Sequence, residues 1–238
     1  MNILDILMIV LLVFVVLVCC YQGFLRSTFT LIGFFVACLL AVIFSPLVSN
    51  TMENNPNLHA AIVSYTEGSE MLAEEDVELA RVPISQLSAE QIHALTQRGK
   101  FPYPLASFIE KNLHSAAFED RGISQLADYI SYTFASFVFN IVAFVIVFIL
   151  TFIMAIISIA VIDNASPFLV MRKFDLFAAA GVGIILSCGL CFLIALFVPV
   201  VLFTMGQQLS FVREIVDESL FARMFYQHNF FFYLLHST

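Results

Sequence analysis

The sequence predicts an all-α integral membrane protein with four transmembrane helices in two hairpins, a polar, partly helical insert between the hairpins and an amphipathic C-terminal tail. Two observations lead to this fold class. Hydrophobic residues make up 61% of the 238 residues and charged residues only 12%, whereas a soluble domain carries about 25% charged residues. Four apolar runs are also long enough to cross a bilayer, which takes about 20 mainly apolar residues in a helix.

The four runs cover residues 6–21, extended by Ile3 and Leu4, then 29–48, 132–162 and 176–203. They are apolar on every side, whereas membrane β-strands alternate polar and apolar residues. We expect the first run to be retained rather than cleaved as a signal peptide, because Asp5 stands where a positive charge would be needed and a second run follows at once. The chain therefore divides into a hairpin (1–48), an insert (49–128), a second hairpin (129–205) and a tail (206–238).

The third run is longer than a bilayer requires. A straight helix over residues 131–162 would measure about 48 Å at 1.5 Å per residue, against roughly 30 Å for the bilayer core. It must either tilt strongly or project beyond the membrane. Ser124 is a candidate N-cap of this helix, and Asn140 needs a partner inside the protein rather than lipid.

The insert carries most of the charge. Residues 53–128 contain twelve acidic and five basic side chains, and thus seven of the eight net negative charges, which argues against nucleic acid as a partner. Ser88 and Gln91 have capping-box spacing, and Pro104 is placed to open a second short helix. We expect small amphipathic helices on the membrane surface, with a disordered acidic linker as the alternative.

The sequence of the tail predicts one amphipathic helix over residues 210–224, followed by an aromatic cluster. Phe211, Ile215, Leu220 and Met224 recur at near-helical spacing. Because aromatic side chains favour the membrane interface, we expect this helix to lie on the membrane surface, and docking of a protein partner is the alternative.

Basic residues predict the orientation. Arg26 in the first turn, and Arg172 and Lys173 in the second, place both hairpin turns in the cytoplasm and the insert outside, because Lys and Arg collect in short cytoplasmic loops. Gly23 permits the tight reversal beside Arg26.

Small residues recur at every fourth position in two of the runs. They are Gly33, Ala37, Ala41 and Ser45 in the second run, and Ala179, Gly183, Ser187, Cys191 and Ala195 in the fourth. Such ribbons let helix backbones approach closely, which is how transmembrane helices associate. They predict helix packing within the fold, or alternatively at a dimer interface.

Catalysis is not expected. The five cysteines lie within apolar runs, and the histidines lie outside them without ligand spacing. No metal-hydrolase, nucleophile-elbow, phosphate-loop or dinucleotide motif occurs. We therefore predict no enzyme activity, no cofactor and no metal.

Several short motifs carry a family resemblance. They are Ile3-Leu4-Asp5, Gly23-Phe24-Leu25-Arg26, Leu31-Ile32-Gly33, Asp175 with the ribbon that follows it, and Glu218-Ser219-Leu220. On these motifs most of the chain resembles the colicin V production protein family, and the insert resembles the longer versions found in low-GC Gram-positive bacteria. Gln22 and Ser27 depart from the family pattern, which commonly has a basic and an acidic residue there.

The resemblance implies a bacterial cytoplasmic (inner) membrane protein that is associated with toxin production or export and with envelope homeostasis. The family itself has no established biochemical mechanism. The resemblance thus implies a process and leaves the molecular activity open.

Two function classes are compatible with the residues. An oligomeric transport or channel component needs polar groups along a path, and the candidates are Asp5, Arg26, Asn140, Asp163 and Asp175. The four charged candidates lie at the ends of the runs, where they could equally anchor the helices at the membrane interface. The alternative is a scaffold or assembly factor that binds protein partners, unknown at this point, through its insert and tail.

Overall fold

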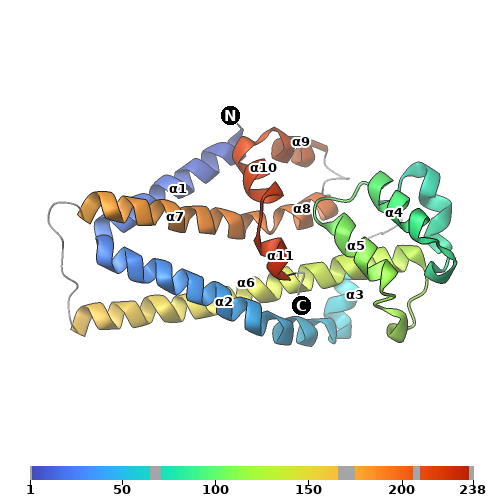
Figure 1. The fold of residues 1–238 in the computed structure, drawn as a ribbon, viewed down its shortest axis with the longest axis horizontal. Coiled ribbons are helices and arrows are strands. Elements are labelled where there is room, and N and C mark those ends of the chain that lie inside the picture. The colour runs from blue at the N-terminus through green and yellow to red at the C-terminus, as the bar shows by residue number, and fades with distance from the viewer. Residues whose placement is uncertain (1, 65–70, 166–174, 206–209, 236–238) are drawn as a thin grey trace. The chain divides into compact units, whose positions relative to one another are not determined.

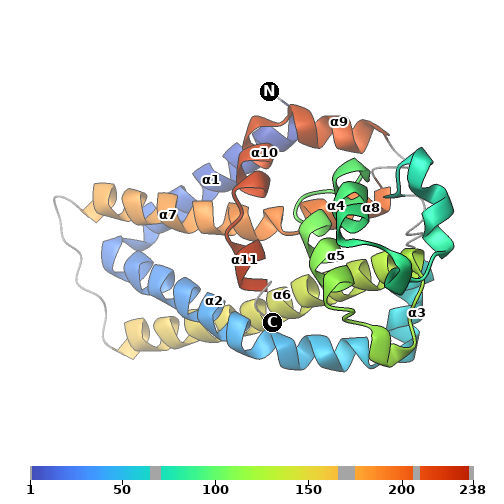
Figure 2. The same ribbon diagram turned by 45° about the vertical axis from the view of Figure 1, so that its right-hand side comes forward.

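The structure, a computed structural model, describes residues 2–64, 71–165, 175–205 and 210–235. The described residues are overwhelmingly helical, and four helices are long and apolar enough to cross a membrane (Figures 1 and 2). The predicted all-α membrane fold is therefore confirmed. Contacts divide the chain into two compact units: unit 1 comprises Met1–Pro46, Val142–Val198 and Phe211–Thr238, and unit 2 comprises Leu47–Ile141 and Pro199–Ser210.

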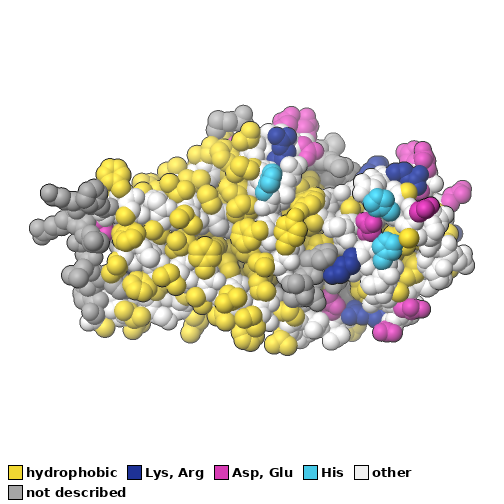
Figure 3. Space-filling model, viewed as in Figure 1, with side chains coloured by type: hydrophobic (Ala, Val, Ile, Leu, Met, Phe, Trp, Pro, Cys, Tyr) yellow, Lys and Arg dark blue, Asp and Glu magenta, His cyan; other side chains and the backbone are white. Residues whose placement is uncertain are grey.

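Unit 1 contains the parts of the chain with the most apolar surface. Its helices are α1 (Ile3–Gln22), α2 (Phe24–Glu53) as far as Pro46, α6 (Leu126–Ala165) from Val142 onward, α7 (Asp175–Ala195), and the tail helices α9 (Ser210–Glu218), α10 (Leu220–Gln227) and α11 (Phe231–Leu235). Helix α1 packs along α7, and α10 packs on both of them. Leucine, isoleucine, valine and phenylalanine side chains cover its surface, as expected of a protein whose solvent is lipid (Figure 3).

Unit 2 contains the insert and has a core of its own. Its helices are α3 (Pro56–Ser64), the 3-10 helices η2 (Glu74–Arg81), η3 (Ile84–Gln86) and η4 (Glu119–Arg121), α4 (Ala89–Arg98), α5 (Leu105–His114) and most of α8 (Val198–Met205). Leu95, Leu105 and Ile109 from the insert are fully buried, as are Tyr129 and Ile130 from the first turns of α6. The insert is thus a folded unit, and it differs in this from the disordered linker that the sequence also allowed.

Helix α6 belongs to both units. Its 40 residues would span about 60 Å at 1.5 Å per residue, twice the roughly 30 Å of a bilayer core. The unit boundary falls between Ile141 and Val142. Residues 129–205 are predicted to form one hairpin, whereas contacts group residues 126–141 with the insert, where their apolar side chains fill the core of unit 2.

Two helix boundaries differ from the sequence prediction. Helix α6 begins at Leu126 rather than directly after Ser124, because an isolated bridge holds the backbone extended there. The Ile84 amide donates to the Ser124 carbonyl oxygen, and the Leu126 amide donates to the Val82 carbonyl oxygen. The single tail helix predicted over residues 210–224 is wrong. Helix α9 ends at Glu218, and Ser219 leaves the helix to become the N-cap of α10, accepting a hydrogen bond from the Ala222 amide.

Candidate functional site

Asp5 lies in the first turn of α1 and clamps the tail. Its Oδ1 accepts hydrogen bonds from Ser219 Oγ at 2.7 Å and from the Phe221 amide at 3.0 Å, while its Oδ2 accepts one from the Asn2 amide at 3.0 Å. Asn2 adds a bond from its side-chain amide to the Ile215 carbonyl oxygen. Asp5 is 3% exposed, so it is a fully satisfied buried carboxylate at the N-terminus of α10, where the helix dipole favours negative charge.

Asp175 repeats this arrangement at the other end of α1. The Phe24 amide, the first of helix α2, donates to Asp175 Oδ1 at 3.1 Å. The turn between α1 and α2 is the single residue Gly23, whose φ of +83° suits glycine, and a Cβ built there would lie 2.9 Å from Asp175 Oδ2. The tight reversal expected at Gly23 is present, and Asp175 packs directly against it.

Arg26 and Asp163 form an ion pair at this same end of unit 1. Arg26 Nη1 lies 2.9 Å from Asp163 Oδ2, with 35% and 24% of the two side chains exposed. The pair joins the first turn of α2 to the last turns of α6, and the Cys20 thiol donates to the Leu176 carbonyl oxygen nearby. The end of α1, the start of α2, the end of α6 and the start of α7 therefore meet at one end of unit 1.

Asn140 has the internal partner that its position required. Ser49 Oγ of α2 donates to Asn140 Oδ1 at 2.6 Å. One turn away Ser136 Oγ donates to Glu53 Oε1 at 2.7 Å, and Arg121 pairs with the other oxygen of Glu53 at 3.1 Å. All five residues belong to unit 2, so these polar bonds hold α2 against α6 within that unit.

Every polar residue predicted as a candidate is thus bound to another part of the chain. The four charged ones join helices to one another within the protein. Asp5 and Asp175 cap distant helices, and Arg26 is neutralised by Asp163. The other two basic residues predicted for orientation, Arg172 and Lys173, lie outside the described residues. The arrangement is one that holds helices together.

The two ribbons of small residues lie inside the protein. Gly33, Ala37, Ala41 and Ser45 of α2 are buried, and so are Ala179, Gly183, Ser187, Cys191 and Ala195 of α7. A Cβ built on Gly183 would lie 2.9 Å from the Val16 Cα of α1, and one on Gly33 would lie 3.1 Å from the Ala155 Cβ of α6. The ribbons therefore face α1 and α6 within unit 1, and the helices approach to backbone contact.

Sequence reasoning missed two contacts. Phe34, 2% exposed, packs edge-on against Phe148 and Phe152 of α6, and a Cβ on Gly189 of α7 would lie 2.7 Å from its ring. Asn229, 1% exposed, donates to the Phe192 carbonyl oxygen at 2.7 Å and fixes the tail to the end of α7. A glycine among large apolar residues and an asparagine in an aromatic segment were the available signals.

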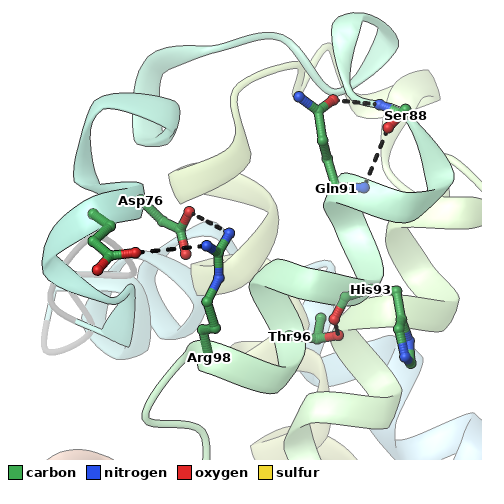
Figure 4. A network of polar contacts seen from close by, with 7 residues as sticks. Asp76, Ser88, Gln91, His93, Thr96 and Arg98 are labelled. Atoms are coloured by element: carbon green, nitrogen blue, oxygen red, sulfur yellow. Dashed lines mark hydrogen bonds and ion pairs between the residues drawn. The ribbon is translucent and has the colours of Figure 1, made fainter.

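The insert contains a buried carboxylate of its own, drawn in Figure 4. Asp76 Oδ1 accepts a hydrogen bond from Arg98 Nη2 at 2.9 Å, and the same guanidinium lies 3.7 Å from Glu75. The predicted capping box is present as well, since Ser88 and Gln91 exchange hydrogen bonds at the start of α4. Within the described ranges, no three His, Cys, Asp or Glu side chains are close enough together to hold a metal ion.

Four membrane-length helices, the close packing of α1 and α7 and the internally satisfied polar groups define a multi-pass α-helical membrane protein. The family model described as colicin V production protein matches residues 4–68, which cover α1, α2 and α3. This match confirms the predicted resemblance to the colicin V production protein family over residues 4–68, which is about a quarter of the chain, and the remaining residues have no such match. Neither a curated protein nor a solved structure matches the chain.

Proposed function

We propose that this protein is a non-catalytic scaffold or assembly factor in the cytoplasmic membrane of a bacterium, and that it serves the production or export of a colicin V-like toxin and the homeostasis of the envelope. The colicin V production match supports the process. The molecular role is supported by one observation: Asp5, Arg26, Asp163 and Asp175 each bind another part of the same chain.

A conduit places polar or ionisable groups along the path of its substrate. Here those groups are used to cap helices and to pair with one another at the ends of the helices. The folded insert offers a surface for protein partners instead. We propose neither cofactor nor nucleic acid as a ligand, since the net charge of −8 repels polyanions.

Transport by several copies is the second candidate. Gly181 on α7 is exposed, and a Cβ built there would meet nothing within 4 Å, so another helix could approach this backbone. In that case the path for the substrate would run between several copies of the chain and not through one copy. This candidate requires a homo-oligomer.

Two measurements test the proposal. In a bacterium that produces a colicin V-like peptide toxin, deletion of the gene should lower the toxin activity of the medium, and the wild-type gene should restore it. Vesicles that contain only this purified protein should retain the enclosed toxin. Unchanged toxin activity after deletion would remove the process from the proposal, whereas toxin efflux from vesicles together with a defined oligomer mass in detergent would favour transport.

A further inference from the structure

The outward face of the C-terminal tail is unusually apolar. Five large side chains of α9 to α11 are exposed: Phe211, Leu220, Met224, Phe230 and Tyr233. Leu220 is 61% exposed and Tyr233 is 72% exposed. A soluble surface rarely presents such residues together, so they mark a surface that something apolar covers.

The opposite face of the tail is fixed to the bundle, which makes the outward face a defined surface. Phe225 meets Phe192 of α7 edge-on, and Phe231 lies against Phe144 of α6. Asp5 binds the Ser219 hydroxyl and the Phe221 amide at the start of α10. The exposed side chains are therefore those that the docked helices cannot turn inward.

The exposed surface of α10 has an apolar strip with a polar side chain next to it. Leu220 and Met224 are four residues apart and form the apolar strip. With 3.6 residues per turn, the exposed Arg223 lies about 60° from Leu220 and about 100° from Met224 around the helix. An apolar strip that borders a polar one is typical of a helix lying in the plane of a membrane interface.

The position of the tail agrees with the end of a membrane span. Helix α1 has 20 residues, which as a helix measure about 30 Å, the thickness of a bilayer core. The tail binds α1 at its first residues, through Asn2 and Asp5. The docked helices therefore lie at the depth where a bilayer changes from acyl chains to headgroups.

The exposed side of α1 next to the tail indicates that lipid covers the apolar strip of α10. Ile3, Leu7 and Val10 on the outward side of α1 are between 57% and 68% exposed, and α10 packs on this helix. Figure 3 shows hydrophobic side chains continuing from the membrane helices onto the tail. Because the outward side of α1 faces acyl chains, the same lipid reaches the neighbouring strip of α10.

We propose that the tail is an interfacial lipid-binding element, in which Leu220 and Met224 contact acyl chains while Arg223 faces water. The described charged side chains around the strip are mostly acidic, namely Glu214, Asp217 and Glu218 beside Arg223. Attraction to anionic headgroups therefore contributes little. The contact should form equally in neutral phosphatidylcholine and at high salt. This inference does not depend on the proposed function.

The chain contains no tryptophan, so a single introduced indole reports its own surroundings. Leu220→Trp and Met224→Trp place the probe on the apolar strip, and Arg223→Trp on the polar side of the same helix is the matched control. Each full-length variant is reconstituted in phosphatidylcholine vesicles with or without brominated acyl chains. We expect blue-shifted emission that brominated lipid quenches at 220 and 224, and emission that aqueous acrylamide quenches at 223.

Two outcomes would overturn the proposal. Equal quenching by acrylamide at 224 and 223 would mean that the strip faces water. Blue-shifted emission at 220 and 224 that brominated lipid leaves unchanged would mean that protein, for example a second copy of the chain, covers the strip. Circular dichroism of each variant verifies that the helices are intact.

Discussion

Single carboxylates fix distant helices in this protein. Asp5 accepts hydrogen bonds from the Phe221 amide in the first turn of α10 and from the hydroxyl of its N-cap Ser219, and Asp175 binds the first amide of α2. A helix N-terminus has unpaired amides and a partial positive charge, so a carboxylate there satisfies both at once. Because Asp5 is buried, water competes little for its hydrogen bonds to the helix start. An acidic residue near a span is therefore as well explained by helix capping as by ion transport.

The insert offers a sharp test of burial at the residue scale. Arg98 faces two acids, Asp76 with 4% of its side chain exposed and Glu75 with 81% exposed. Arg98→Ala should lower the free energy of unfolding of the insert by about 1–3 kcal/mol, because it leaves a buried carboxylate without its donor. Glu75→Ala should change it by less than about 1 kcal/mol, since exposed ion pairs contribute little.

Urea-dependent protease resistance of the insert in the full-length protein measures both effects. The double variant with Arg98→Ala and Asp76→Ala should be more stable than Arg98→Ala alone, because the unpaired buried charge is then gone. If Arg98→Ala and Glu75→Ala lowered the free energy of unfolding equally, the burial of Asp76 would not explain the contribution of the Arg98–Asp76 pair.

Whether a residue's role could be predicted depended on how far away its partner lies in the sequence. The Ser88 capping box was predictable because Gln91 is three residues away. The bond from Ser219 to Asp5 joins residues 214 positions apart, and no local pattern announces it. The break between α9 and α10 was missed for the same reason: the spacing of apolar residues continues through Ser219, and the carboxylate that stabilises the new helix start comes from α1.

At the scale of elements, glycines set how closely the membrane helices pack. Helix α7 contains two glycines two residues apart with opposite surroundings. A Cβ at Gly183 would lie 2.9 Å from the Val16 Cα, whereas one at Gly181 would meet nothing within 4 Å. Helix α7 thus contacts the backbone of α1 at Gly183, whereas the surface at Gly181 is open. The ribbon of small residues was predictable from sequence spacing, whereas the helix that it contacts was not.

Gly183→Ala and Gly181→Ala add the same methyl group to the same helix. Gly183→Ala should destabilise the bundle by about 1–3 kcal/mol, because the backbone of α1 cannot move aside cheaply. Gly181→Ala should leave the bundle at least as stable as wild type, since alanine favours the helix over glycine. Thermal unfolding of both variants in one detergent gives the comparison. If the two variants unfolded at the same temperature, the close approach of α1 and α7 would be disproved.

At the scale of the whole molecule, each end of unit 1 is defined by its polar contacts. One end holds the Gly23 turn, Asp175 and the pair of Arg26 with Asp163. The other holds Asp5 and the docked tail. The number of membrane helices was predictable from hydrophobic length alone. The use of residues 126–141 as the core of the insert was not, because a helix that is apolar on all sides suits lipid and a protein core equally well.

The contacts of Asp5 and Asp175 leave only two possible orientations of unit 1 in the membrane, which differ in the side on which the Gly23 turn lies. Since the Phe24 amide binds Asp175, the turn at Gly23 and the start of α7 must lie on one side of the membrane, and the tail bound to Asp5 at the far end of α1 must lie on the other. Basic residues collect on the cytoplasmic side, and Arg26, Arg172 and Lys173 all belong to the two turns.

A reporter fused after Thr238 should therefore be exported, and one inserted between residues 163 and 174 should stay in the cytoplasm. A reporter beside Gly23 is the internal control, because it must agree with the insertion between residues 163 and 174 whichever way the protein is oriented. The reverse pattern at all three positions would refute the cytoplasmic assignment of the turns, and disagreement between the two turn reporters would refute the contact of Asp175 with α2.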